Sequence, residues 1–125
     1  MANAEGVAID QPRDHDLEWF ATPADLCRTH VYLAELAAIP GLEPIAEILS
    51  INATAGMDFD ADTWTDLRYK GGSEQGITAV AWWMERADGR IFVLAGGVED
   101  PDAPINTVNA VALLQQGVNL IDQLD

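Results

Sequence analysis

The sequence predicts an α+β fold, with two helices, an antiparallel β-meander of about three strands and a closing helix. A threonine–proline helix start at residues 22–23 precedes apolar residues at helical spacing. From Trp64 onward the apolar period changes to two, and an Asp-Gly pair separates two β-rich runs. Helical spacing returns after Asn106. Helices that are segregated from the strands in this way indicate the α+β class.

The composition limits the size of the fold and the kinds of partner. A chain of 125 residues makes one domain with one core, and 22% charged residues is ordinary for a globular protein. The formal net charge of -15 argues against nucleic acid and anionic membranes as partners, because both require a basic face. The single cysteine, Cys27, excludes an internal disulfide framework and zinc clusters. We therefore expect no cofactor and no metal.

The first 18 residues are polar, small and acidic, and predict a flexible arm ahead of a single domain over 19–125. His15 lies among acidic residues, which we interpret as a solvated stretch and not as a metal site. The chain has no apolar run of membrane-spanning length, and residues 1–16 lack the apolar core of a signal peptide. As written, the sequence predicts a cytoplasmic protein.

The first helix is predicted from Thr22 to about Ala38. Thr22 caps it, Pro23 occupies the first turn, and Asp25 suits the positive end of the helix dipole. Its apolar residues lie on two sides, which predicts burial against more than one element. They are Leu26, Leu33 and Leu36 on one side and Cys27, Val31, Ala34 and Ala38 on the other.

Within this helix, Cys27 is expected to pack in the core and His30 to be a buried residue with a satisfied hydrogen bond. Pro40-Gly41 ends the helix, and a second, short helix is expected over residues 43–49.

The segment that follows has the alternating aspartates of a calcium loop, Asp58, Asp60, Asp62 and Asp66. Such a loop needs glycine at its sixth position and glutamate at its twelfth. Thr63 and Tyr69 stand there instead, so we predict no calcium site.

The strands are expected over 64–70, 77–86 and 90–98. In the first, Trp64 should share a side with Arg68 and Lys70, and the strand should end at a turn formed by Gly71-Gly72. The turn Ala87-Asp88-Gly89 should join the other two strands. The last helix, 106–124, should bury one face, formed by Val111, Leu114, Val118 and Ile121.

The run Lys70-Gly71-Gly72-Ser73 is the candidate site. Lys70 is one of only six basic residues, and the adjacent glycines let the backbone come close to a ligand. A lysine there can hold a carboxylate group on a small substrate. An exposed lysine beside a plain hairpin bend is the alternative interpretation.

These residues also resemble class A β-lactamase-like serine hydrolases. The run Tyr69–Gly76 is similar to the Lys-Thr-Gly or Lys-Ser-Gly box on the third sheet strand of that family. The hairpin Trp82–Ala95 and a C-terminal helix follow the box in the same order. Ala21–Leu26 is similar to the Thr-Pro-x-Asp helix start that precedes it. The resemblance spans roughly residues 19–124, and members of the family are often secreted or periplasmic.

The resemblance implies acyl transfer, in which a serine attacks a β-lactam, ester or amide carbonyl and water releases the acyl-enzyme. Lys70 would hold the substrate carboxylate, and the backbone N–H of Ser73 would supply half of an oxyanion hole. Gly71 and Gly72 would bind substrate. Gly71 stands where the family has serine or threonine, so a hydroxyl donor to the carboxylate is missing.

The family's Ser-x-x-Lys nucleophile motif is absent, because neither Ser50 nor Ser73 is followed by lysine at the third position. The chain therefore resembles the C-terminal half of the fold, without its first two strands, and is expected to be inactive alone. The alternative is a non-catalytic α+β interaction domain that dimerises, as roadblock-like adaptor domains do.

The strand ending at Val98 has no charge or proline after Ile91 to protect a free edge. We expect a homodimer through this edge or by exchanged elements, pairing with the missing N-terminal half of the fold, or a substitute strand from Val7-Ala8-Ile9. With helices on one face only, the other face of the sheet should expose aromatic surface.

Overall fold

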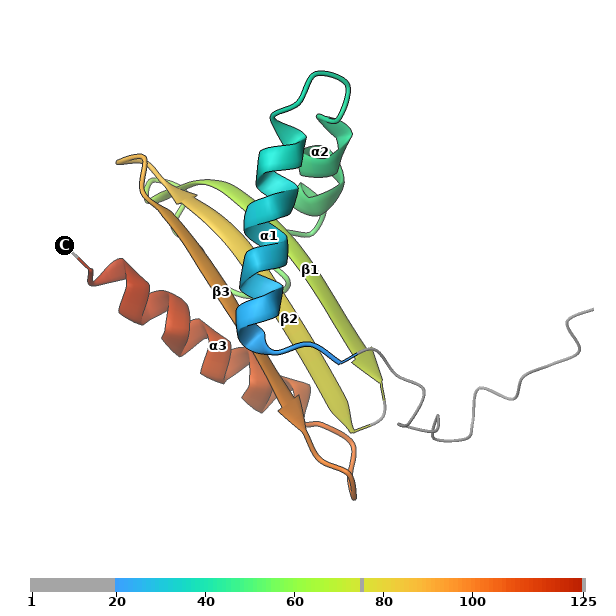
Figure 1. Ribbon diagram of the computed structural model, residues 1–125. Coiled ribbons are helices and arrows are strands. Elements are labelled where there is room, and N and C mark those ends of the chain that lie inside the picture. The colour runs from blue at the N-terminus through green and yellow to red at the C-terminus, as the bar shows by residue number, and fades with distance from the viewer. Residues whose placement is uncertain (1–19, 75, 125) are drawn as a thin grey trace, which may run out of the picture.

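The computed structural model describes residues 20–74 and 76–124 and confirms the α+β class. Two helices come first, then three strands, and one helix closes the chain (Figure 1). Their bounds are α1 Pro23–Ala37, α2 Pro44–Ser50, β1 Trp64–Glu74, β2 Ile77–Arg86, β3 Ile91–Glu99 and α3 Thr107–Asp122. The predicted arm lies outside the described residues.

Side-chain caps mark the starts of α1 and α3, and the cap at Thr22 is the one that the sequence predicts. The Thr22 hydroxyl accepts a hydrogen bond from the Asp25 N–H at 3.2 Å, and the Asp25 carboxylate accepts one from the Thr22 N–H at 3.1 Å. This reciprocal capping box satisfies two N–H groups at the start of α1. At the start of α3, the Asn106 side chain accepts from the Asn109 N–H at 3.1 Å.

The strands form one antiparallel sheet in the order β1-β2-β3. The predicted turn at Gly71-Gly72 is wrong, because β1 continues through both glycines to Glu74 and pairs with β2 along its length. The chain reverses at Gly76, whose φ of +79° is a left-handed value that favours glycine. A Cβ at Gly76 would also lie 2.4 Å from the Asp100 carbonyl oxygen, so close packing requires glycine there as well.

Trp64 does not lie on the predicted side of β1. The pairing register shifts between Trp64 and Asp66, which is the mark of a β-bulge. The shift moves Trp64 to the side of Leu67, into the core, and away from the side that carries Arg68.

Helices cover both faces of the sheet, so the expected exposed aromatic face is wrong. In Figure 1, α1 crosses one face, and α3 packs on the other, where Val118 joins the core around Trp82. Trp82 and Trp83 are neighbours on β2 and point to opposite faces, yet only 1% and 6% of them are exposed. On the α1 side, the Arg68 guanidinium lies 4.3 Å from the centre of the Trp83 ring.

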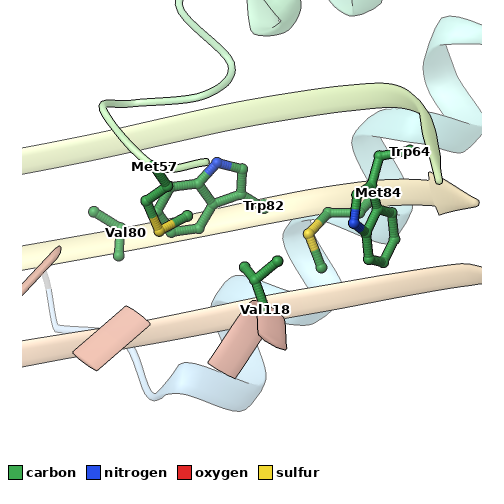
Figure 2. Packing of buried hydrophobic residues seen from close by; sticks show 6 residues of the cluster. All are labelled: Met57, Trp64, Val80, Trp82, Met84 and Val118. Carbon is green, nitrogen blue, oxygen red and sulfur yellow. The ribbon is translucent and has the colours of Figure 1, made fainter. Parts of the chain in front are cut away.

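The main core lies between the sheet and α3, and its buried members are shown in Figure 2. They are Met57, Trp64, Val80, Trp82, Met84 and Val118. The Trp82 Nε1–H donates to the Ala53 carbonyl at 2.8 Å, which fastens the loop after α2 to the sheet. The Trp64 Nε1–H donates to Asp122 at 2.9 Å, which fastens the end of α3. The predicted inward face of α3 is confirmed, because Val111, Leu114 and Ile121 also pack on this core.

Candidate functional site

The Lys70–Ser73 run lies near the end of β1, on the outer edge of the sheet. Among the described residues, β1 has a strand neighbour on one side only. Lys70, Gly72 and Ser73 are exposed, so this part of the edge is open to solvent. An open edge presents unpaired N–H and C=O groups to any chain or ligand that approaches it.

The direction of each backbone group follows from the register of the sheet. The Arg86 N–H donates to the Arg90 C=O at 2.9 Å, so Arg86 turns its backbone groups toward β3. Along an antiparallel strand this direction alternates at every residue. Ala81 and Ala79 lie an odd number of positions before Arg86 along β2, so their backbone N–H and C=O groups point toward β1.

The partners of these two alanines on β1 are Lys70 and Gly72. Their backbone groups therefore face β2, and those of Gly71 and Ser73 face the open side. The N–H of Ser73, which the resemblance implicates in an oxyanion hole, thus points outward at an exposed position.

The side chains of Lys70 and Ser73 leave the strand on opposite faces, because they are three residues apart. The structure does not bring the ammonium and the hydroxyl together on one face. The Lys70 Nζ instead donates to the Gly71 carbonyl at 2.6 Å. Its charge therefore lies at the edge, beside the outward backbone groups of Gly71.

A cavity of about 350 Å³, the edge cavity, lies under this edge, between the sheet and the first turns of α3. Gly71, Gly72 and Ser73 line it, and Lys70 does not. The structure also places Tyr69 and Thr107 in its wall, which sequence reasoning missed. The period of two along 69, 71 and 73 gives a signal for Tyr69, whereas Thr107 comes from a separate helix.

Gly71 has a packing role that explains why it is glycine. A Cβ built there would lie 1.9 Å from the Tyr69 hydroxyl oxygen, so any larger residue must displace that ring. The Tyr69 ring in turn contacts the Trp82 ring, with 4.8 Å between the ring centres and 37° between the ring planes. The Tyr69 side chain therefore lies along the strand, in the space that a side chain at residue 71 would occupy.

No nucleophile and base are paired in the part of the chain that the structure describes. The Ser50 hydroxyl donates to the Ala46 carbonyl on α2, at 2.9 Å. The Cys27 sulfur lies 3.9 Å from the Val93 carbonyl oxygen, consistent with the predicted packing role. No group of three or more His, Cys, Asp or Glu side chains that could hold a metal was found over residues 20–74 and 76–124.

His30 is buried on α1 and only 4% exposed, and its Nδ1 has no hydrogen-bond partner among the described residues. The expectation of a satisfied histidine is wrong for this atom. Burial lowers the pKa of His30, because the charged imidazolium loses its hydration.

Stability is therefore expected to fall as the pH drops below about 6.5, the ordinary histidine value. The unfolded chain takes up the proton first, since the pKa of His30 is lowered only in the folded state. The free energy of unfolding should change with pH by at most about 1.4 kcal/mol per pH unit, because one proton is involved. Urea unfolding between pH 7.5 and 5 measures this pH dependence of the free energy of unfolding, and His30→Leu should remove most of the dependence.

The matched control is His15→Gln, which removes the only other histidine of the chain. Carboxylates with a lowered pKa, such as Asp25 and Asp60, lose their contribution only below about pH 4 and do not interfere. A slope that disappears in His15→Gln and persists in His30→Leu would contradict the assignment.

Comparisons with known proteins leave the family resemblance as a prediction. No family model, no curated protein and no solved structure matches this chain. A search of the described helices for one long and apolar enough to cross a membrane also found none.

Proposed function

We propose that this chain is the C-terminal segment of a β-lactamase-like serine hydrolase, and that the open edge of β1 receives the acyl substrate. One observation carries the proposal. The outward backbone N–H of Ser73 and the Lys70 ammonium lie on the same exposed stretch of edge, within the sequence run that resembles the family's box. The order of a box strand, an Asp-Gly hairpin and a C-terminal helix on the sheet supports it further.

In this proposal the Ser73 N–H donates to the carbonyl oxygen of the substrate. The bond strengthens as that oxygen becomes negative in the tetrahedral transition state. Lys70 binds the carboxylate of the same substrate, and this contact replaces the hydrogen bond that its ammonium donates to the Gly71 carbonyl. The attacking serine comes from outside this chain, so the chain alone forms no acyl-enzyme.

The outer edge of β3 is where a further strand from the other half of the proposed fold would pair. Over the described residues β3 has no strand neighbour beyond β2. The same alternation that exposes Ser73 turns the backbone groups of Val93 and Ala95 to this side, where the Val93 carbonyl oxygen also lies 3.9 Å from the Cys27 sulfur. An N-terminal half would complete the sheet there by adding a strand.

Lys70→Met is expected to weaken binding of benzylpenicillin, a carboxylate-bearing β-lactam, by a factor of about 1.4 to 5. An exposed ion pair contributes roughly 0.2–1 kcal/mol, which sets this range. The melting temperature should hardly change, because Lys70 is exposed and its ammonium donates to the carbonyl of its neighbour Gly71. Amide shifts of Gly71 and Ser73 during a titration measure the binding.

Arg28→Met is the matched control, since it removes an exposed basic residue of α1 that pairs with Asp25. It should leave the titration unchanged. A chromogenic β-lactam assay on the unaltered chain should show no turnover. Equal binding by both variants, or turnover that disappears in Ser73→Ala, would overturn the proposal as stated.

A second candidate is a non-catalytic interaction domain that dimerises. The outward face of α3 favours it, because Leu113 and Leu120 are exposed there and no charged residue occurs between Thr107 and Ile121. Surfaces of this kind mark protein contacts more often than free surface. The oligomeric state of variants on this face tests it.

A further inference from the structure

The walls of the edge cavity are mostly apolar. Val80 and Trp82 of β2 form its floor, and Val111 and Leu114 of α3 close the opposite side. None of the residues that line it carries a charge. The group that fits inside is therefore uncharged and largely apolar.

Four hydroxyl groups line the same cavity, those of Tyr69, Ser73, Thr78 and Thr107. None of them makes a hydrogen bond to another residue in the described part of the chain. Hydroxyls elsewhere in the fold do, as Thr29 does to the Asp25 carbonyl at 2.8 Å. A hydroxyl both donates and accepts, so these four are available to a carbonyl or ether oxygen on a bound molecule.

The size of the cavity limits the ligand. Small-molecule pockets start at about 300 Å³, and an apolar cavity of about 150 Å³ admits benzene. The edge cavity, at about 350 Å³, thus has room for one ring with a short polar arm. Gly71 preserves this room, because a side chain there would push Tyr69 from its place along the strand.

We propose that the edge cavity binds the uncharged aryl group of an acyl compound. The amide carbonyl oxygen next to that aryl group, which is a different carbonyl from the one that the Ser73 N–H would bind, lies among the cavity hydroxyls. Gly71, Gly72 and Ser73 belong both to the cavity and to the open edge, so a bound ring lies next to the outward Ser73 N–H. Assigning the ring to the acyl side chain of a substrate rests on the proposed function. Binding of the ring itself does not require Lys70, which lies outside the cavity.

Phenylacetamide, which is uncharged and has one ring, is the probe. Titration followed by amide and methyl shifts should show saturable, weak binding at Val80, Val111 and Ser73. Acetamide, which lacks the ring, should bind at least about tenfold more weakly. Ala110→Leu should reduce phenylacetamide binding at least about tenfold, because Ala110 lines the cavity and is 7% exposed.

Ala112→Leu is the matched control, since it makes the same substitution two residues along α3 at an exposed position. It should leave binding unchanged. Thr78→Val adds a test that keeps the shape of the cavity, and the loss of its hydroxyl should weaken binding severalfold. This second variant keeps the proposal falsifiable if Ala110→Leu does not fold.

The failure of this inference is distinguishable from failure of the proposed function. Absence of phenylacetamide shifts at tens of millimolar, or equal loss in Ala110→Leu and Ala112→Leu, overturns the cavity as a binding site. If phenylacetamide binds but Lys70→Met does not change the affinity for benzylpenicillin, the hydrolase proposal alone is overturned. Lys70→Met should not change phenylacetamide binding in either case.

Discussion

Trp82→Ala is expected to lower the free energy of unfolding by about 3–5 kcal/mol. Trp82 is 1% exposed at the centre of the sheet, and the centre of its ring lies 4.8 Å from the centre of the Tyr69 ring. Its removal opens a void and leaves the Ala53 carbonyl without the indole N–H that it accepts at 2.8 Å. Domains of this size are stable by only about 5–15 kcal/mol, so much of the chain should be unfolded at moderate urea concentrations.

Two companion variants separate packing from hydrogen bonding. Trp82→Phe keeps an aromatic ring and loses the bond to Ala53, so it should cost about 1–3 kcal/mol. Ile48→Ala removes an apolar side chain that is 65% exposed on α2 and should cost well under the value for Trp82→Ala. Urea unfolding followed by circular dichroism measures all three. If Trp82→Ala and Ile48→Ala cost the same, the core is not centred on Trp82.

Much of the fold is predictable because local signals decide where its elements begin. The capping residue Thr22 marks the start of α1, and its cap forms as predicted. The helix expected from residue 106 begins at Thr107, where the Asn106 side chain caps it. The Asp88-Gly89 turn lies between β2 and β3, as predicted, and Gly89 has a left-handed φ of +82°. These features depend on a few neighbouring residues, which a sequence displays directly.

The position of the first hairpin could not be predicted in the same way. Gly71-Gly72 and Gly76 both read as turn signals in the sequence. Distant contacts decide between them, because Gly71 leaves space for the Tyr69 hydroxyl and Gly76 packs against the Asp100 carbonyl. The displaced Trp64 has a similar origin, since a bulge depends on pairing with β2.

The candidate site was located from sequence, but its geometry was not. Lys70 and Ser73 are predicted from residue types and their spacing, and their role in a site stays a prediction. Which backbone groups point to the open edge depends on the hydrogen-bonding register with β2, which strand composition does not determine. The edge cavity further needs α3, which joins it through Thr107 and Ala110. The burial of His30 without a partner for Nδ1 is likewise a property of the packed structure.

The outer face of α3 leads to the second large effect. We define it by Val108, Leu113, Gln116 and Leu120. The three apolar members are 75%, 61% and 65% exposed, respectively. From Thr107 to Ile121 the sequence has no charged residue, although the whole chain has a net charge of -15. Two copies repel one another through their acidic surfaces, so a contact between copies is most favourable at this uncharged face.

The spacing of this face suits a second copy of the chain. Leu113 and Leu120 are seven residues apart, with Gln116 between them. In an antiparallel pair of α3 helices, Leu113 meets Leu120 of the second copy, and the two Gln116 side chains meet near the twofold axis. An amide both donates and accepts hydrogen bonds, so this residue is complementary to itself, as a symmetric contact requires.

Leu113→Asp combined with Leu120→Asp is therefore expected to convert a dimer into a monomer. The association of two copies should be at least about a hundredfold weaker, because four carboxylates would face one another across the contact. Sedimentation equilibrium at micromolar concentration measures this. Tyr32→Asp combined with Ile48→Asp adds the same charge at exposed positions on α1 and α2 and should leave the dimer intact. Raising the salt concentration should strengthen dimerisation of the unaltered chain, because salt screens the repulsion between two copies of charge -15. A monomer at all salt concentrations, or equal dissociation of both double variants, would rule out α3 as the contact and leave the unpaired side of β3 as the place to look for one.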